Sequence, residues 1–127
     1  MNGKEYTKLV EEFQVKGYIK WNNTFNHADY YWGKSFHRED NRFDEDRAGY
    51  LILCYVYDYT DKDYPQLTPE QKDHVGISVV IMVSRTIDER IDLTLTWNDK
   101  STIDSIEKVA ESFYQWACTN WPKPRGF

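Results

Sequence analysis

The sequence predicts a single α+β domain over residues 1–127, with an antiparallel sheet of about five strands and the N- and C-terminal helices packed on one face. Apolar residues recur with helical spacing near both ends of the chain, whereas between them they alternate with a period of two in several short segments. The connections between these segments are short, which favours antiparallel pairing of neighbouring strands. A chain of 127 residues is long enough to bury the core of one such domain.

The first predicted element is a helix from about Gly3 to Lys16. Asn2 and Glu5 have the spacing of a capping box. Apolar residues then follow at helical intervals, namely Tyr6, Leu9, Val10 and Phe13. Gly17 can adopt the left-handed conformation that ends a helix. A short strand over residues 18–21 and an asparagine-rich turn are expected next.

The stretch HADYYWGKSFHRED, residues 27–40, raises a choice between a metal or catalytic site and an ordinary strand. From residue 29 to 37 the bulky side chains fall mainly on even positions, which predicts a strand paired with residues 18–21. Residues 38–47 are then a charged connection.

The segment over residues 50–59 predicts the central strand, because both of its faces carry apolar or aromatic side chains. Residues 60–75 form a loop in which Thr68, Pro69 and Gln71 have the spacing of a capped helix of one or two turns.

Residues 77–84 and 91–97 alternate strictly and predict a hairpin with one well-defined buried face. From Thr102 the period becomes helical and continues to about Thr119, with Ser101 and Asp104 as the expected capping pair. The apolar stripe of this helix consists of Ile103, Ile106, Ala110, Phe113 and Ala117.

The alternation also predicts which face of the sheet the helices cover. The aliphatic residues of the hairpin and Ile52, Cys54 and Val56 are expected under the helices. The opposite face then presents Tyr31, Ser35, His37, Leu51, Leu53, Tyr55, Tyr57, Tyr59, Ser78, Val80, Met82, Thr94 and Thr96. This set is unusually apolar for a surface, so either another molecule docks there or a loop, residues 38–47 or 60–75, covers it within the chain.

The histidines and aspartates do not predict a metal site. In a straight strand the backbones of His27 and His37 stand roughly 33 Å apart, so the two side chains cannot share an ion. The aspartates from Asp58 to Asp63 lack the glycine and glutamate of a calcium loop, because Gln66 and Lys72 occupy those places. No nucleophile motif or phosphate-binding loop is present, so no cofactor and no catalytic residue is predicted.

The net charge of −5 disfavours nucleic acid as a partner and favours a protein with a basic surface. No stretch of the sequence has the length and apolarity of a membrane span. The two cysteines, Cys54 and Cys118, lie in apolar and amphipathic runs where free thiols are typical. These features predict a cytoplasmic protein.

The leading functional hypothesis is a non-catalytic acidic protein-binding domain, such as an inhibitor, an immunity-type protein or an adaptor. It would use the tyrosine-rich sheet face together with the acidic segments 38–47 and 58–63. The residues expected to contact the partner are Tyr31, His37, Tyr55, Tyr57, Tyr59, Asp58, Asp61 and Met82.

Two alternatives stay open. The first is a small-ligand-binding protein or enzyme whose pocket lies on the same face, with His37, Asp58 and the tyrosines as its polar groups. The second is a homodimer that buries this face. The order of elements, the small size and the acidity are similar to those of secretion chaperones, which dimerise and hold partner segments. The predicted middle helix is shorter than the helix of their usual dimer contact.

Overall fold

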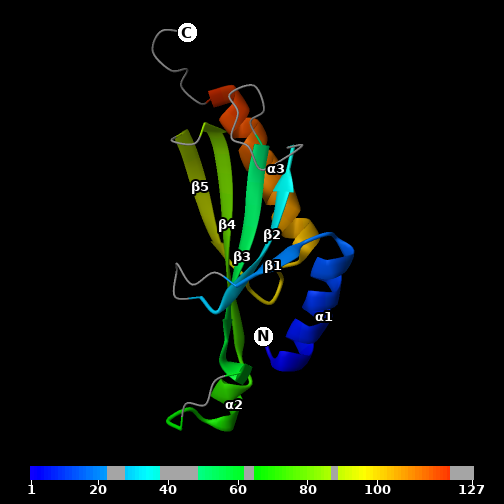
Figure 1. Ribbon diagram of the computed structural model, residues 1–127, viewed down its shortest axis with the longest axis vertical. Helices are drawn as coiled ribbons and strands as arrows, with labels where there is room; N and C mark the ends of the chain where they lie inside the picture. Colours follow the sequence, from blue (N-terminus) through cyan, green and yellow to red (C-terminus); the bar gives the residue numbers. More distant parts are fainter. Residues whose placement is uncertain (23–27, 38–48, 62–64, 87–88, 121–127) are drawn as a thin grey trace.

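The computed structural model describes residues 1–22, 28–37, 49–61, 65–86 and 89–120, and it confirms the predicted α+β fold (Figure 1). One five-stranded antiparallel sheet has the order β1-β2-β3-β4-β5, so each strand pairs with the next along the chain. The elements are α1 (Gly3–Val15), β1 (Ile19–Trp21), β2 (Tyr30–Phe36), β3 (Gly49–Asp58), the 3₁₀ turn η2 (Tyr59–Asp61), α2 (Pro69–Lys72), β4 (Val75–Thr86), β5 (Glu89–Thr96) and α3 (Ile103–Asn120).

The helix ends follow from local side-chain hydrogen bonds. Asn2 and Glu5 form the expected capping box of α1, and Thr68 and Gln71 form that of α2. Gly17 ends the first helix with a φ of 84°, in the left-handed region that glycine adopts without steric cost.

The capping pair of α3 differs from the prediction by one residue. The N–H of Ser105 donates to Oγ1 of Thr102 at 3.0 Å, and the N–H of Thr102 donates to Oγ of Ser105 at 2.9 Å. The Ser101 hydroxyl instead accepts a hydrogen bond from the N–H of Asn98 in the preceding turn. The expected pair of Ser101 and Asp104 is therefore wrong, because the turn after β5 uses Ser101 for its own closure.

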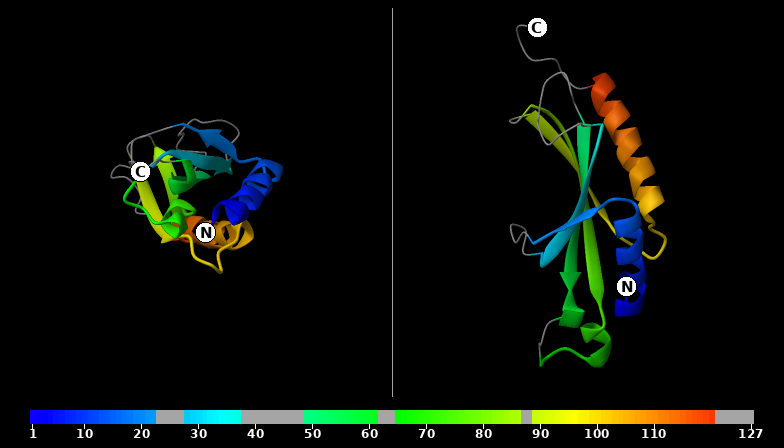
Figure 2. Two further views of the ribbon diagram at one scale, coloured as in Figure 1. Left: turned by 90° about the horizontal axis from the view of Figure 1, so that it is seen from below. Right: turned by 45° about the vertical axis from the view of Figure 1, so that its right-hand side comes forward.

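The core lies between the sheet and the two long helices, which follow one another along the same side of the sheet (Figure 2). Ile52, Val56, Val79 and Ile81 face the helices with no exposed surface at all. Phe13 of α1 and Ala110 of α3 are likewise fully buried opposite them. The predicted direction of the alternation is confirmed, and burying each such aliphatic side chain contributes about 1.5–3 kcal/mol.

Aromatic residues complete the core on the side of α1. The Trp32 ring stacks on Phe13, with centroids 5.5 Å apart and planes 11° from parallel. Its Nε1–H donates to the hydroxyl of Tyr6 at 3.0 Å, so the buried indole has a partner. The Tyr30 hydroxyl donates to the Asp58 carboxylate at 3.2 Å at the edge of the same cluster.

Candidate functional site

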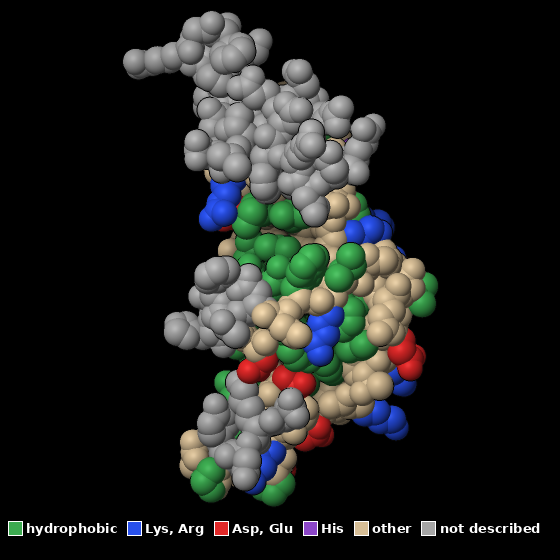
Figure 3. Space-filling view, in the orientation of Figure 1, with side chains coloured by type: hydrophobic (Ala, Val, Ile, Leu, Met, Phe, Trp, Pro, Cys, Tyr) green, Lys and Arg blue, Asp and Glu red, His purple; other side chains and the backbone are tan. Residues whose placement is uncertain are grey.

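The strongest candidate site is the side of the sheet turned away from both helices. We call it the aromatic sheet face and define it by side chains on β1 to β4 that the described helices leave uncovered. Its residues are Ile19, Trp21, Tyr31, Leu51, Leu53, Tyr55, Tyr57, Val80 and Met82. Figure 3 shows hydrophobic side chains gathered over the strands on this side.

Strand register brings these residues together. Trp21 pairs with Tyr31, which in turn pairs with Tyr55 on the central strand. Leu53, also on β3, pairs with Val80 on the next strand, β4. Because side chains at paired positions point to the same side of a sheet, one continuous surface results.

Aromatic rings form a row across three strands of this face. The Trp21 and Tyr31 rings lie 6.5 Å apart and nearly parallel, and the Tyr31 and Tyr55 rings are 5.4 Å apart and tilted by 51°. Partial burial, reinforced by the neighbouring Tyr31 hydroxyl, raises the pKa of Tyr55 above the ordinary tyrosine value. The phenol therefore stays neutral at physiological pH and can donate a hydrogen bond to a docked molecule.

A hollow of about 410 Å³ opens beside this row, over Gly33. A Cβ atom at Gly33 would stand 3.1 Å from the side chain of Leu53 and 3.4 Å from that of Tyr31. Because Gly33 has no Cβ, the side chains of Leu53 and Tyr31 can lie close to the backbone of β2. The surrounding lining is mostly apolar: Ile19, Trp21, Tyr31, Leu51 and Leu53.

The face becomes polar where it reaches β5. Arg90 lies 3.8 Å from the sulfur of Met82 and 3.7 Å from the carboxylate of Asp92. The threonines of β5 on this side, Thr94 and Thr96, are exposed. An apolar centre with a polar border is the arrangement found in protein interfaces.

The predicted contact residues fall into two groups. Tyr31, Tyr55, Tyr57 and Met82 lie together on the aromatic sheet face. Three of the others lie at or just after the end of β3, namely Asp58, Tyr59 and Asp61. The fourth, His37, lies off the face and contacts α3.

At the end of β3, the Asp58 carboxylate accepts hydrogen bonds from the Tyr30 hydroxyl and from the backbone of Thr60. The Tyr59 ring lies 6.1 Å from the ring of His74. Asp61 is the last residue of η2, and the position of its side chain is not among those described. The carboxylate of Asp58 therefore acts within the fold, in holding the turn after β3.

The placement of His37 on this face is wrong. Its φ is +57°, so strict alternation ends at Phe36 and the imidazole turns towards α3. There it stacks on the Tyr114 ring at 4.7 Å and contacts both carboxylate oxygens of Glu111 at 2.9 Å. His37 thus belongs to the contact between the sheet and α3.

Two residues of the face were missed by the sequence reasoning. Ile19 and Trp21 are 58% and 50% exposed, although both are large and apolar. Their alternation with Lys20, taken in register with the next strand, was the available signal. The strand is only three residues long, which made its sidedness easy to overlook.

The 60–75 connection, as far as the structure describes it, is not seen over the face. The described part of the 60–75 connection, including α2, extends past the ends of β3 and β4 (Figure 1). Residues 38–47, the other expected cover, lie outside the described residues.

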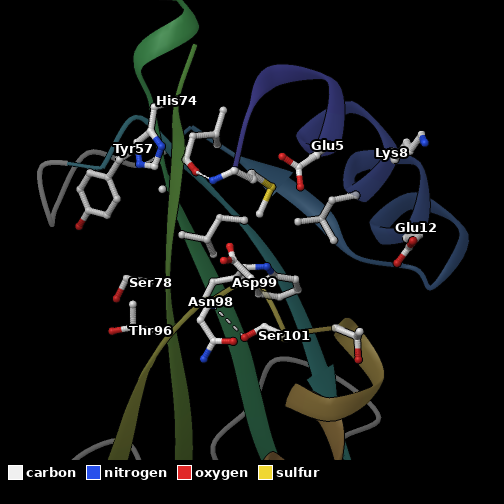
Figure 4. A pocket seen from close by; sticks show the side chains of 17 residues that line it. Glu5, Lys8, Glu12, Tyr57, His74, Ser78, Thr96, Asn98, Asp99 and Ser101 are labelled. Carbon is white, nitrogen blue, oxygen red and sulfur yellow. Dashed lines mark hydrogen bonds between the residues drawn. The ribbon is translucent and has the colours of Figure 1, made fainter. Parts of the chain in front are cut away.

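A second hollow, of about 450 Å³, opens between α1, the start of β4 and the turn after β5 (Figure 4). Glu5, Lys8 and Glu12 line it from the helix, and His74 and Asp99 line it from the other walls. Tyr57 also contributes, whereas the polar groups expected for a pocket, His37 and Asp58, do not line this hollow.

No group of three potential metal ligands occurs among the residues that the structure describes. In the same part of the chain, no helix is long and apolar enough to cross a membrane. The Cys54 thiol is buried, and burial raises its pKa to about 12, so it is protonated and unreactive at neutral pH.

Comparison with family models, with curated proteins and with solved structures returned no match.

Proposed function

We propose that this chain is a non-catalytic, acidic protein-binding domain that docks another protein on the aromatic sheet face. The observation that carries the proposal is the row of Trp21, Tyr31 and Tyr55, which lies on the side of the sheet opposite both helices. Tyrosine and tryptophan give large contact areas with few rotatable bonds, and they are enriched at energetically important interface positions.

The surrounding residues support the same function. Aliphatic side chains from β3 and β4 extend the aromatic row into a patch with a polar border at Arg90 and Asp92. The hollow over Gly33 offers a place for one anchoring side chain of a partner. An inhibitor, immunity-type or adaptor role in the cytoplasm fits these features.

Charge favours a basic partner. The chain carries 21 acidic and 16 basic residues, so its mean field attracts a positively charged protein and repels nucleic acid. Asp58 and Asp61 add acidic residues at the end of β3, and Asp63 follows them in the sequence.

Site-specific photocrosslinking in the cells that make the protein tests this proposal. A benzoyl-phenylalanine at Tyr55 should give a discrete crosslinked product with another protein, and in a lysate of the same cells the yield should fall as salt is added. The same probe at Val15, which is 87% exposed on α1, should give none. Equal crosslinking from both positions, or none from Tyr55, would contradict the proposal.

A charge substitution supplies the matched comparison. Leu53→Arg places a cation in the middle of the face and should abolish the product, whereas Val15→Arg makes the same change of charge elsewhere and should leave it intact. Both variants should retain the circular dichroism of the parent, because neither residue belongs to the buried core.

The hollow between α1 and β4 favours a second candidate, the binding of a small polar ligand. It is lined by carboxylates, a lysine and a histidine above an apolar floor that includes Leu9 and Ile77. Thermal-shift screening of metabolites against the parent and Glu12→Gln tests this candidate. A shift present in the parent and absent in the variant would support it, and a screen with no shift would remove it.

A further inference from the structure

We propose that two copies of this chain pair through β5, antiparallel to each other, about a twofold axis at Leu93. Strand β5 lies at one edge of the sheet. In Figures 1 and 2 no described segment lies alongside its outer edge. An edge strand with unpaired backbone groups is a template for a further strand.

The ladder shows which backbone groups point outward. The N–H of Trp97 donates to the carbonyl of Ile77 at 3.1 Å, so these two residues face each other across β4 and β5. Since bonded and non-bonded pairs alternate in an antiparallel ladder, Leu95 and Leu93 also bond to β4. The N–H and C=O groups of Asp92, Thr94 and Thr96 consequently point away from the sheet.

The side chains of β5 on the helix side are only partly covered. Ile91, Leu93 and Leu95 are half-buried, although their neighbours Val79 and Ile81 on β4 have no exposed surface. They pack against the core from its margin. A second strand at this edge would complete their burial.

Helix α3 presents further apolar surface on the same flank. Glu111 and Tyr114 lie on the flank of α3 that contacts β2 and β3. Helical periodicity therefore turns Val109, Phe113 and Trp116 towards β4 and β5. Trp116 is 55% exposed and stacks on Phe113 with ring centroids 6.1 Å apart, which leaves a large aromatic surface on the flank of α3 opposite Tyr114.

The sequence of β5 is complementary to itself in one register. With the axis at Leu93, each Leu93 meets its own copy and Ile91 meets Leu95, so apolar side chains pair on the helix side. On the other side Arg90 faces Thr96 and Asp92 faces Thr94, so no like charges stand directly opposite. Moving the axis to Asp92 would bring the two Asp92 carboxylates face to face, and moving it to Thr94 would shorten the paired segment.

This pairing joins the two sheets edge to edge. Because the axis is perpendicular to the sheet, both pairs of helices lie on one side and both aromatic sheet faces lie on the other. The dimer therefore leaves the face of the proposed function open in each copy. The two proposals rest on different surfaces and can fail independently.

Cysteine crosslinking tests the register. In a Cys118→Ser background, Leu93→Cys should form a disulfide-linked dimer under mild oxidation, because opposite Cβ atoms in such a pair are about 4.5–5.5 Å apart. Leu95→Cys is the matched control, since its two copies would stand about 14 Å apart. Crosslinking of Leu95→Cys as readily as of Leu93→Cys, or of neither variant, would overturn the proposal.

A backbone substitution tests the edge itself. Thr94→Pro removes an outward N–H that β4 does not use, and proline is tolerated at such edge positions. Light scattering should give twice the chain mass of 15.2 kDa for the parent and for Thr94→Val, and the chain mass for Thr94→Pro with unchanged circular dichroism. A monomeric parent, or a dimer that persists in Thr94→Pro, would contradict pairing through β5.

Discussion

The Nε2 atom of His37 lies 2.9 Å from both carboxylate oxygens of Glu111, and this contact joins the end of β2 to the middle of α3. The Tyr50 hydroxyl donates to the same carboxylate at 2.8 Å. Partial burial acts to raise the pKa of Glu111, but the hydrogen bonds from Tyr50, His37 and Gln115 outweigh it and hold the pKa below the ordinary glutamate value.

This contact predicts a pH-dependent contribution to stability. A carboxyl group with a lowered folded-state pKa stabilises the fold above its unfolded pKa, and the effect is lost as pH falls through the folded-state value. Glu111→Gln should lower the free energy of unfolding at neutral pH by up to about 1 kcal/mol, given its exposure, and by less in acid. Urea titrations across the acidic range measure this, with Glu11→Gln on α1 as control. A difference that does not shrink in acid would refute the assignment.

Gly17 should be more sensitive to substitution than Gly76. Its φ of 84° strains any residue with a Cβ, so Gly17→Ala should cost about 1–2 kcal/mol of stability. A Cβ at Gly76 would make ordinary contacts at 3.7 Å and 3.9 Å, so Gly76→Ala should change stability little. Chemical denaturation of both variants checks this, and equal losses would contradict it.

The Tyr6 hydroxyl should be important for stability although it is far from the aromatic sheet face. Tyr6→Phe leaves the buried Nε1–H of Trp32 without its acceptor, which should cost about 1–3 kcal/mol. Tyr31→Phe, on the side of the sheet that the described helices leave open, should cost less than about 0.5 kcal/mol. If the two variants unfold at the same denaturant concentration, the hydrogen bond is not contributing as described.

The two cysteines should differ sharply in reactivity. Cys118 is exposed, whereas burial raises the pKa of Cys54 to about 12. A thiol reagent at neutral pH should therefore label one site in the native protein and both after unfolding. Native Cys118→Ser should be unreactive, and rapid labelling of that variant would show that Cys54 is accessible.

Much of the fold was predictable because local chemistry and burial agree. Asn2 with Glu5 and Thr68 with Gln71 each specify a helix start within four residues, and Gly17 marks a helix end. The alternation in β3 and β4 is long enough to define which side is buried. Tyr31, Tyr55, Tyr57 and Met82 were placed together on one face by this reasoning alone.

The errors occur where geometry depends on a single residue. A left-handed φ at His37 reverses the direction of its side chain, and nothing in the alternation reveals it. Ser101 and Thr102 are both good capping residues, and the hydrogen bond from Asn98 decides between them. Trp21 was missed because a strand of three residues gives too short a pattern, although its partner Tyr31 was recognised.

Hydroxyl-radical footprinting of the purified chain, read by mass spectrometry, tests the central claim most directly. Trp21, Tyr55 and Met82 should be oxidised rapidly, because they lie on the side of the sheet that the described helices leave open, whereas Trp32 and Tyr50, at 5% and 2% exposure, should be protected. Protection of Trp21 and Tyr55 to the level of Trp32 would show that this face is covered and unavailable to a partner.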